Sequence, residues 1–573
     1  MILKALYDYY HRSGDLPPMG FEKKEIYFII VIDEEGNFVR IDDTRDGKTP
    51  KSYIVPRAEK RAAGIKANLL WDNVEYVLAV PKDDNDTDAS NKAKQKRAAF
   101  IERCKTIADS CPDVIEFKAI CEFYNKGINL VDSAENWDIL LKERTRNVTF
   151  QLEHSLDLIP SIDAVKNHLA SGANTELSAA QSYCLVTGKK GEPVRLTTST
   201  SIPGSQATAS LVAFQKSSGY DSYGKEQCYN APISEEAEAA YVTALKKLTA
   251  KDSRNKTNLG SRTLLFWASN TNEASMEVEE SFFSFLEGNK ADNPDRNIAV
   301  IIKSLKSIWS GEKPTSEDDR FYMLGLAPNS ARIAVVYWNE CTVKEFAGKM
   351  LEHFNDMEIV DGRKEQKPYK GIYAMLSAVT MGGKVSDAQP NLPEAVLKSI
   401  VQGTAYPHTL FSACIRRIRA ELGETGGFSI TRMAILKAEL NRLNDNNKKI
   451  EIMLDKENTN LGYICGRLFA VLEYTQKSAN NINTIRERYM NAASATPAAV
   501  FATLLNLNLH HVEKLENEGR KVFIETLKQE IVSLIPANGF PAHLDLQDQG
   551  RFFVGYYHQL QDFYTKKSTE TKE

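Results

Sequence analysis

The sequence predicts an α+β protein: a mixed α/β N-terminal body with β-hairpins and long loops, followed by an all-α C-terminal helical bundle. Short β-branched runs lie beside Gly/Asn turns in the first third, and the middle is rich in Ser, Thr, Gly and Gln. From about Thr342 the apolar residues recur at helical spacing. We therefore expect a body at 1–341, a helical connecting region at 342–452 and a helical bundle at 453–573.

The N-terminal elements begin with a predicted helix at 3–11. Residues 26–32 and 38–41 flank an Asp/Glu/Gly/Asn turn, which is the signature of a β-hairpin. The apolar, β-branched run at 74–80 is typical of a strand, and Pro81 ends it.

A charged helix is predicted next, at about 90–108. Its apolar stripe is expected to contain Ile101, Cys104 and Ala108, with lysines and arginines on the other faces.

The middle of the chain, about 180–275, is interpreted as strands joined by long loops. Residues 197–210 form one such loop, with Pro203-Gly204 at its centre. The runs 264–268 and 333–338 are expected to be strands.

The C-terminal third is interpreted as helical. Ile430, Met433, Leu436, Leu440 and Leu443 recur every three or four residues. The polar stretch 444–449 interrupts this periodicity. Further helices are predicted near 460–478, 483–491, 497–516, 520–535 and 546–565.

Composition narrows the class of protein. The 573 residues include 72 Lys and Arg against 76 Asp and Glu, a net charge of −4, which argues against one dominating basic face. The eight cysteines form no C-x-x-C and are expected to be reduced. No apolar run approaches the ~18–20 residues that span a bilayer, and the N-terminus has no signal-peptide core. We expect a cytoplasmic protein.

Catalytic signatures are missing from the sequence. It has no G-x-x-x-x-G-K-[ST], no H-E-x-x-H and no G-x-S-x-G motif. Asp84, Asp86 and Asp88 fit the start of a calcium loop, but Ala89 and Gln95 stand where Gly and Glu are required, which favours a solvated acidic loop. We expect a binding protein with no catalytic residue, metal or cofactor.

A basic, loop-like segment is the first candidate binding site. Between positions 48 and 66 there are six cations and a single acid, Glu59. The cations are Lys48, Lys51, Arg57, Lys60, Arg61 and Lys66. The segment leads into Asn68, Trp71 and Asn73, and amide or aromatic side chains can read or stack on bases. A second basic run spans 92–105. The alternative is that both runs are solvated faces and that Trp71 belongs to the core.

Two Gly-containing loops of the middle region are the second candidate binding site. Glycine permits close backbone approach to a ligand, and amides suit phosphate or minor-groove contacts. The residues concerned are Gly204 and Gln206 in one loop, and Tyr220, Tyr223, Lys225 and Gln227 in the other. The alternative is that both are ordinary turns between strands.

Several stretches, in order along the chain, resemble one family. They are the opening Met1–Tyr10, Pro17–Phe21, Gly64–Asn73, Cys184–Gly188, Ser222–Gln227, Leu324–Arg332, Ala493–Pro497 and Phe540–Leu544. Together they resemble the large subunit of the subtype I-C CRISPR interference complex (Cascade).

The resemblance implies a non-catalytic DNA-recognition subunit for antiviral defence. Such subunits inspect duplex DNA for a protospacer-adjacent motif (PAM), begin strand separation and R-loop formation, and help to recruit a helicase–nuclease. The implied partners are the crRNA-bound backbone subunits, the crRNA 5′-handle-binding subunit, small subunits, target duplex and displaced strand. The helical C-terminus is implied to pack along the complex like its small subunits.

The resemblance also implies a small subunit made by internal translation. Met453 would open a 121-residue product just after the polar break at 444–449. Met433 lies inside a periodic helix, and Met490 would lose the first helix of the bundle.

Residue roles follow as expectations. We place Asn68, Trp71 and Asn73 near the PAM, the cations Lys51, Arg57, Lys60, Arg61 and Lys66 on phosphates, and the two Gly loops at a strand-separating wedge or the minor groove. Two alternatives remain at this point: a metal-dependent nuclease of the same defence system, and an architectural scaffold without DNA-sequence preference.

Overall fold

The computed structural model describes residues 1–59, 64–83, 86–127, 131–172, 181–216, 219, 221, 223–287, 294–362, 371–422, 428–443, 447–482 and 484–564. The chain folds as two compact units. Unit 1 comprises residues 1–200 and 212–247, and unit 2 comprises 201–211 and 248–573. The α+β class predicted from the sequence is confirmed, because small sheets lie in the N-terminal half and helices dominate the C-terminal region.

Unit 1 contains a four-stranded sheet in the order β3-β2-β6-β5, a two-stranded sheet of β1 and β4, and a short pair of β7 and β8. The strands β2 and β3 form the predicted antiparallel hairpin, whereas β6 runs parallel to β2. The strand bounds are β1 (Phe21–Glu25), β2 (Phe28–Ile32), β3 (Phe38–Asp43), β4 (Ser52–Pro56), β5 (Trp71–Asn73), β6 (Asn147–Leu152), β7 (Ser182–Tyr183) and β8 (Lys190–Gly191).

The alternation of β2 side chains builds two cores in unit 1. Phe28 and Ile30 join the larger core, in which Phe100 of α3 stacks on Phe150 of β6. On the opposite face, Ile29 and Val31 pack with Val55 and Trp71. The helices are α1 (Ile2–Arg12), α2 (Val74–Leu78), α3 (Thr87–Ser110), α4 (Ile115–Lys126), α5 (Trp137–Lys142), α6 (Asp163–Gly172) and α7 (Glu235–Thr249), with 3₁₀ turns η1 (Val131–Ser133), η2 (Ile159–Ser161) and η3 (Gln227–Asn230).

Two local expectations in and around unit 1 are wrong, and a third is confirmed only in part. The run 74–80 is a short helix, α2, because the Asn73 side chain accepts the Tyr76 N–H and caps it. The α3 helix forms where predicted, and of its expected stripe Cys104 is buried and Ala108 packs against the core. Its other buried residues are Ala93, Phe100 and Ile107, whereas Ile101 is only half-buried. The middle region contains the helix α7, which begins after Ser234 with three acidic residues and has lysines in its last turn.

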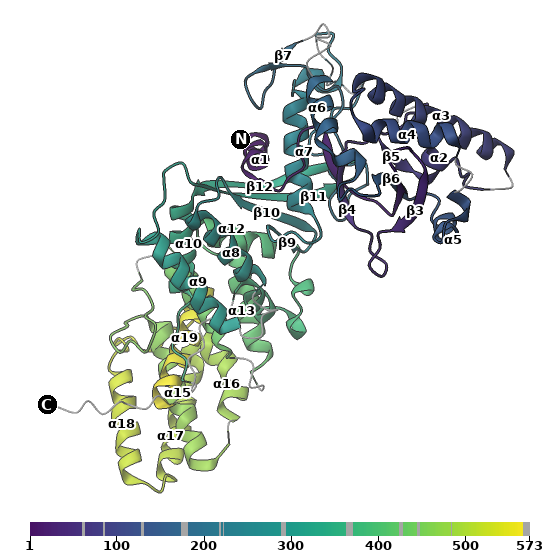
Figure 1. Cartoon of the computed structure of the whole chain (residues 1–573). Coiled ribbons are helices and arrows are strands. Elements are labelled where there is room, and N and C mark those ends of the chain that lie inside the picture. The colour runs from purple at the N-terminus through teal and green to yellow at the C-terminus, as the bar shows by residue number, and fades with distance from the viewer. Residues whose placement is uncertain are drawn as a thin grey trace. The chain divides into compact units, whose positions relative to one another are not determined.

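Unit 2 contains an antiparallel sheet in the order β12-β11-β10-β9, with α8, α9 and α10 on one side (Figure 1). The strands predicted at 264–268 and 333–338 are confirmed as parts of β10 and β12. The bounds are β9 (Lys256–Leu259), β10 (Arg262–Ala268), β11 (Arg320–Asn329), β12 (Arg332–Thr342), α8 (Glu273–Glu287), α9 (Pro294–Trp309) and α10 (Val343–Asp356).

The rest of unit 2 is helical, as predicted, and all five helices expected after residue 460 are present (Figure 1). The bounds are α11 (Ile372–Ala378), η4 (Met381–Gly383), η5 (Val385–Asp387), α12 (Leu392–Gln402), α13 (His408–Ala420), α14 (Ile430–Arg442), α15 (Leu461–Asn480), α16 (Thr484–Ala495), α17 (Pro497–Glu513), α18 (Glu518–Val532) and α19 (Leu546–Tyr564). The helices α15 and α19 pack closely against each other along their length. One continuous apolar core runs from the sheet into these helices.

Two expectations about the whole chain can be compared with the structure. All eight cysteines lie in described positions and are free thiols, as the sequence predicts. Among the helices that the structure describes, none is both long enough and apolar enough to cross a bilayer.

Candidate nucleic-acid interface

Trp71 lies in the core of unit 1. Its side chain is 1% exposed, its Nε1–H donates to the carbonyl oxygen of Pro56 at 2.8 Å, and the Lys24 ammonium lies 5.6 Å from its ring centroid. The hydrogen bond ties β5 to the end of β4. Trp71 therefore belongs to the core and anchors the basic segment. A core position for Trp71 is the alternative that the sequence left open.

Asn68 is also buried, with 4% of its surface exposed. Its Oδ1 accepts the backbone N–H of Glu59 at 2.9 Å, and its own N–H donates to Asp72 Oδ2 at 2.9 Å. Asp72 Oδ1 in turn accepts the N–H of Asn73. These bonds join residue 59 to residues 68–73. Asn68 and Trp71 thus hold together the described residues of 48–73, which we call the stem.

Arg57 ties the same stem to α7. Its guanidinium lies 3.2 Å from the carboxylate of Glu238, which is almost completely buried, and donates to Thr198 Oγ1 at 2.6 Å. Glu238 also accepts the Thr198 N–H at 2.6 Å. A buried carboxylate needs such partners, because desolvation of an unpaired charge is costly. Glu238 was not identified from the sequence, since 181 residues separate it from Arg57.

The remaining predicted phosphate contacts fall into two groups. Lys48, Lys51 and Lys66 are exposed on unit 1. Lys60 and Arg61 lie outside the described residues. The stem therefore exposes its lysines to solvent. The side chains of Asn68, Trp71 and Arg57 instead form contacts within unit 1.

The second basic run, on α3, is partly neutralised inside unit 1. Lys96 forms an ion pair with the buried Glu75 at 2.9 Å, and Arg103 pairs with Glu59 at 2.5 Å. Lys92, Lys94 and Lys105 remain exposed. The acidic loop before α3 also has a structural role, since Asp86 accepts the N–H groups of Asp88 and Ala89 and caps the helix.

The loop at 223–227 presents an aromatic ring to solvent. Tyr223 is 99% exposed and has φ of 50°, a left-handed conformation unusual for a residue with a large side chain. Gln227 holds the loop, because its N–H donates to Asp221 and its Oε1 accepts from Arg195 at 2.7 Å. Lys225 is exposed, and its carbonyl accepts from Asn230. Tyr220 lies outside the described residues.

The other predicted loop belongs to unit 2. Gly204 has φ of 83°, and a Cβ added there would lie 3.3 Å from Pro328. The Gln206 N–H donates to the carbonyl of Ser330 at 3.2 Å. These contacts place Gly204 and Gln206 on the β11–β12 turn, whereas the 48–73 segment and Tyr223 belong to unit 1.

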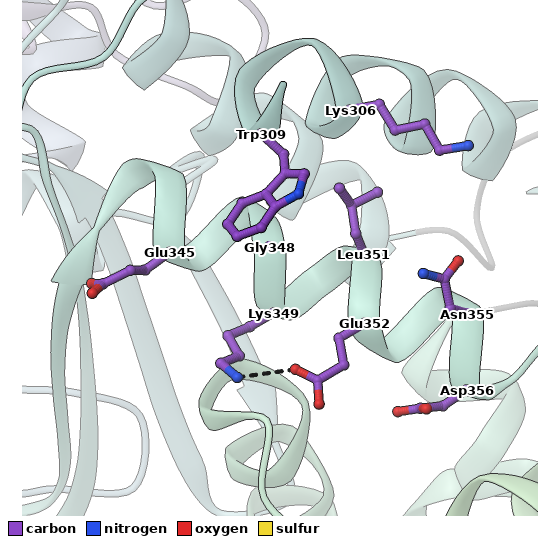
Figure 2. Close-up of a pocket in the computed structure, with 9 residues that line it drawn as sticks. All are labelled: Lys306, Trp309, Glu345, Gly348, Lys349, Leu351, Glu352, Asn355 and Asp356. Atoms are coloured by element: carbon purple, nitrogen blue, oxygen red, sulfur yellow. Dashed lines mark hydrogen bonds and ion pairs between the residues drawn. The ribbon is translucent and has the colours of Figure 1, made fainter. Parts of the chain in front are cut away.

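Unit 2 also contains a pocket of about 520 Å³ between α9 and α10 (Figure 2). The indole of Trp309 lies against Gly348, where an added Cβ would approach the ring to 2.6 Å. Lys349 pairs with Glu352 at 3.0 Å. The lining carries three carboxylates, Glu345, Glu352 and Asp356, against Lys306 and Lys349, so its charge does not favour a polyanion.

Comparison with known proteins identifies the family of the chain. No curated protein matches it. A family described as CRISPR-associated protein (Cas_Csd1) matches residues 5–564, which is nearly the whole chain and includes both units. The chain belongs to the Cas_Csd1 family of CRISPR-associated proteins.

Proposed function

We propose that this chain is the non-catalytic large subunit of a subtype I-C Cascade, which recognises the PAM in duplex DNA, promotes strand separation and helps to recruit the helicase–nuclease. Membership of the Cas_Csd1 family over residues 5–564 is the observation that carries the proposal, because it indicates a subunit of a multi-subunit CRISPR complex. In such complexes base pairing with the guide reads the long target sequence, so a protein subunit has only a short duplex element to read.

The geometry of the 48–73 stem supports DNA contact by unit 1. Exposed lysines at its surface, Lys48, Lys51 and Lys66, supply the positive charge that phosphates require. Asn68 and Trp71 are positioning residues in this proposal, because their polar groups already bind Glu59 and Pro56. Asn73 is half-buried, more exposed than Asn68, and its Oδ1 caps α2 by accepting the Tyr76 N–H, so in this proposal its amide NH2 contacts a base edge.

The Tyr223 loop supports strand separation. Opening a duplex requires a side chain that can enter between base steps, and an exposed ring on a braced turn meets that requirement. The loop leads into α7, whose Glu238 binds Arg57, so the same unit carries both the wedge and the basic stem.

A binding experiment tests PAM recognition. Asn68→Ala releases the Glu59 N–H, and we expect affinity for a cognate-PAM duplex to fall about tenfold and to fall more than affinity for a duplex lacking the motif. Lys51→Ala is the matched control, because loss of a phosphate contact weakens both duplexes alike. Titration of the assembled complex with fluorescent duplexes measures both ratios. Equal losses for Asn68→Ala on the two duplexes would reject a PAM-reading stem.

A second experiment tests the wedge. Tyr223→Asn removes the ring but tolerates the left-handed backbone, and Tyr223→Phe keeps the ring. We expect Tyr223→Asn to reduce opening of the PAM-proximal base pairs severalfold with duplex binding retained, while Tyr223→Phe opens them normally. A base analogue that fluoresces when unstacked reports the opening. Normal opening by Tyr223→Asn would exclude this residue as the wedge.

We also propose that an internal product beginning at Met453 supplies the small subunit. Met453 is exposed in a non-helical segment, and the five helices α15–α19 all follow it. In the full chain, Phe411 of α13 and Leu440 of α14 pack against Gly550 of α19, so the shorter product presents that face to another subunit. Intact-mass analysis of the purified complex tests the proposal, and it fails if no chain beginning at Met453 is found.

A further inference from the structure

A second pocket of unit 2 lies at the edge strand β9 and has a volume of about 670 Å³. It differs from the pocket of Figure 2 in its charge. Three cations and one carboxylate line it, together with hydroxyl, amide and aromatic groups. The lining is Pro203, Thr249, Lys251, Asp252, Ser253, Arg254, Lys256, Thr257, Asn258, Phe283 and Tyr373.

The turn between α7 and β9 forms one rigid wall. The Lys256 ammonium donates to the carbonyls of Thr249 and Ala250 at 3.0 and 2.6 Å and so caps the end of α7. Asn255 Nδ2 donates to the Phe266 carbonyl and to Glu279, which joins the turn to β10 and α8. Lys256 is therefore committed to the fold.

Lys251 and Arg254 are the cations of the pocket that face solvent. Lys251 is exposed. The Arg254 side chain is 62% exposed although it pairs with Glu280, and its guanidinium lies 4.9 Å from the Phe283 ring centroid. The Phe283 ring orients the guanidinium without burying it. Because Glu280 already binds Nη2, a phosphate must bind the remaining N–H groups or replace Glu280.

Pro203 of the lining lies in a second hydrogen-bonded turn. Ser205 Oγ accepts the Ile202 N–H and donates to the Ile202 carbonyl, which closes a turn around Pro203. This turn is anchored where Gly204 contacts Pro328 and Gln206 binds Ser330. Tyr373 of α11 is half-buried and supplies an aromatic ring. The pocket is thus built from four separate segments of one unit.

We propose that this pocket binds a short phosphodiester segment of single-stranded nucleic acid, with Lys251 and Arg254 on phosphates and Tyr373 as a stacking surface. Cations that track the backbone beside aromatic rings are the features by which proteins hold unpaired strands. Hydroxyl and amide groups of Ser253 and Asn258 suit contacts with sugar or base. The proposal extends the proposed function to a strand site in unit 2 and rests on that function only for the source of the strand.

Charge reversal tests the site in the full-length chain. The pocket variant carries Lys251→Glu and Arg254→Glu. The matched control carries Lys306→Glu and Lys344→Glu beside Trp309, which makes the same change in charge elsewhere in unit 2. Fluorescence anisotropy with a labelled oligo(dT) and an oligo(U) of equal length measures binding. We expect roughly a tenfold or larger loss for the pocket variant and a small loss for the control.

The salt dependence gives an independent readout. Neutralising both cations, with Lys251→Ala and Arg254→Ala, is expected to reduce the slope of log affinity against log salt by about 1.4, because each phosphate contact on a single strand contributes about 0.7. Tyr373→Leu is expected to weaken binding about tenfold while Tyr373→Phe binds normally. Equal losses in the pocket and control variants, an unchanged slope, or absence of binding to both oligonucleotides by the wild-type chain would each overturn the proposal.

The oligonucleotides also separate this inference from the proposed function. Tighter binding of DNA identifies the strand as displaced DNA, and tighter binding of RNA identifies it as guide RNA; both results support the site. The pocket variant is expected to retain the preference of the complex for cognate-PAM duplex. If the wild-type complex shows no preference for cognate-PAM duplex, the proposed function is rejected and the strand site is not affected. If the pocket variant binds both oligonucleotides as well as the wild type does, only the strand site is rejected.

Discussion

The stem of unit 1 and the helix pair α15–α19 of unit 2 are held together by different means. In the stem, side chains bind backbone groups: Trp71 binds Pro56, and Asn68 binds Glu59. Between α15 and α19, glycines without side chains let the two helix backbones come into contact. A Cβ added at Gly466 would lie 2.0 Å from the carbonyl oxygen of Phe552, and one at Gly555 would lie 2.3 Å from that of Tyr463.

The difference predicts how each region responds to change. A hydrogen-bonded stem can lose one bond and loosen without unfolding, because the remaining bonds still join the same strands. Two helices in backbone contact have no side chain that can move aside, so an added methyl group must separate them. The stem is therefore expected to tolerate substitution, as a surface that adapts to a ligand requires, whereas the glycine contacts are expected to be intolerant.

The largest expected effect is that of Gly466→Ala. Overpacking usually costs roughly 1–3 kcal/mol, and we expect more here because the atoms that the methyl group meets belong to the backbone of α19. Hydrogen exchange should show loss of protection throughout 461–480 and 546–564. Gly14→Ala is the control, since an added Cβ at Gly14 meets no atom within 4 Å. Similar stability of the two variants would contradict the close approach of α15 and α19.

The sequence predicts the helices of this pair but not their contact. Leu461–Asn480 and Leu546–Tyr564 follow the expected spans closely, because regular apolar spacing extends over several turns. Gly462 and Gly466 stand in a G-x-x-x-G spacing, which is typical of a close helix contact but does not say which helix provides the other side. Gly555 is far away in sequence and carries no such signal. The cap by Asn73 similarly converts an apparent strand into α2, since one local hydrogen bond outweighs weak β-propensity over five residues.

The candidate site was predictable as a segment and less so as individual residues. A concentration of six cations marks residues 48–66 without knowledge of the fold. Which side chains face solvent depends on partners elsewhere in the chain, such as Glu238 for Arg57. The pocket at β9 leaves no compact sequence signal, because its walls come from residues near 203, 254, 283 and 373.

The next effect concerns a buried carboxyl that, unlike the stem residues, lacks a full set of partners. Glu439 of α14 is buried, His408 Nδ1 lies 3.5 Å from its Oε1, and its Oε2 has no hydrogen-bond partner among the described residues. Burial raises the pKa of Glu439 from 4.5 to about 9, although the Phe411 backbone N–H opposes the rise.

Glu439→Gln should therefore stabilise the protein at neutral and alkaline pH. The folded carboxyl keeps its proton while the unfolded one ionises, so wild-type stability falls as pH rises between about 4.5 and 9. We expect a gain of about 2–3 kcal/mol at pH 7.5 and little gain at pH 4. Thermal unfolding across this range measures it, with the exposed Glu358→Gln as control. A difference between Glu439→Gln and wild type that does not change with pH would rule out a raised pKa.

The smallest expected effect tests the tolerance of the stem. Trp71→Phe keeps an aromatic ring in the core but leaves the Pro56 carbonyl without its donor, which should cost about 1–2 kcal/mol. Because Asn68 still binds Glu59, we expect the stem to loosen without unfolding unit 1, and trypsin to cut more rapidly after Lys60, Arg61 and Lys66. Trp309→Phe makes the same chemical change at a side chain that is 51% exposed and should alter neither stability nor cleavage. If Trp71→Phe instead unfolds unit 1 as a whole, the stem depends on its indole hydrogen bond as strongly as α15 and α19 depend on their glycine contacts. The two regions would then not differ in their tolerance of substitution.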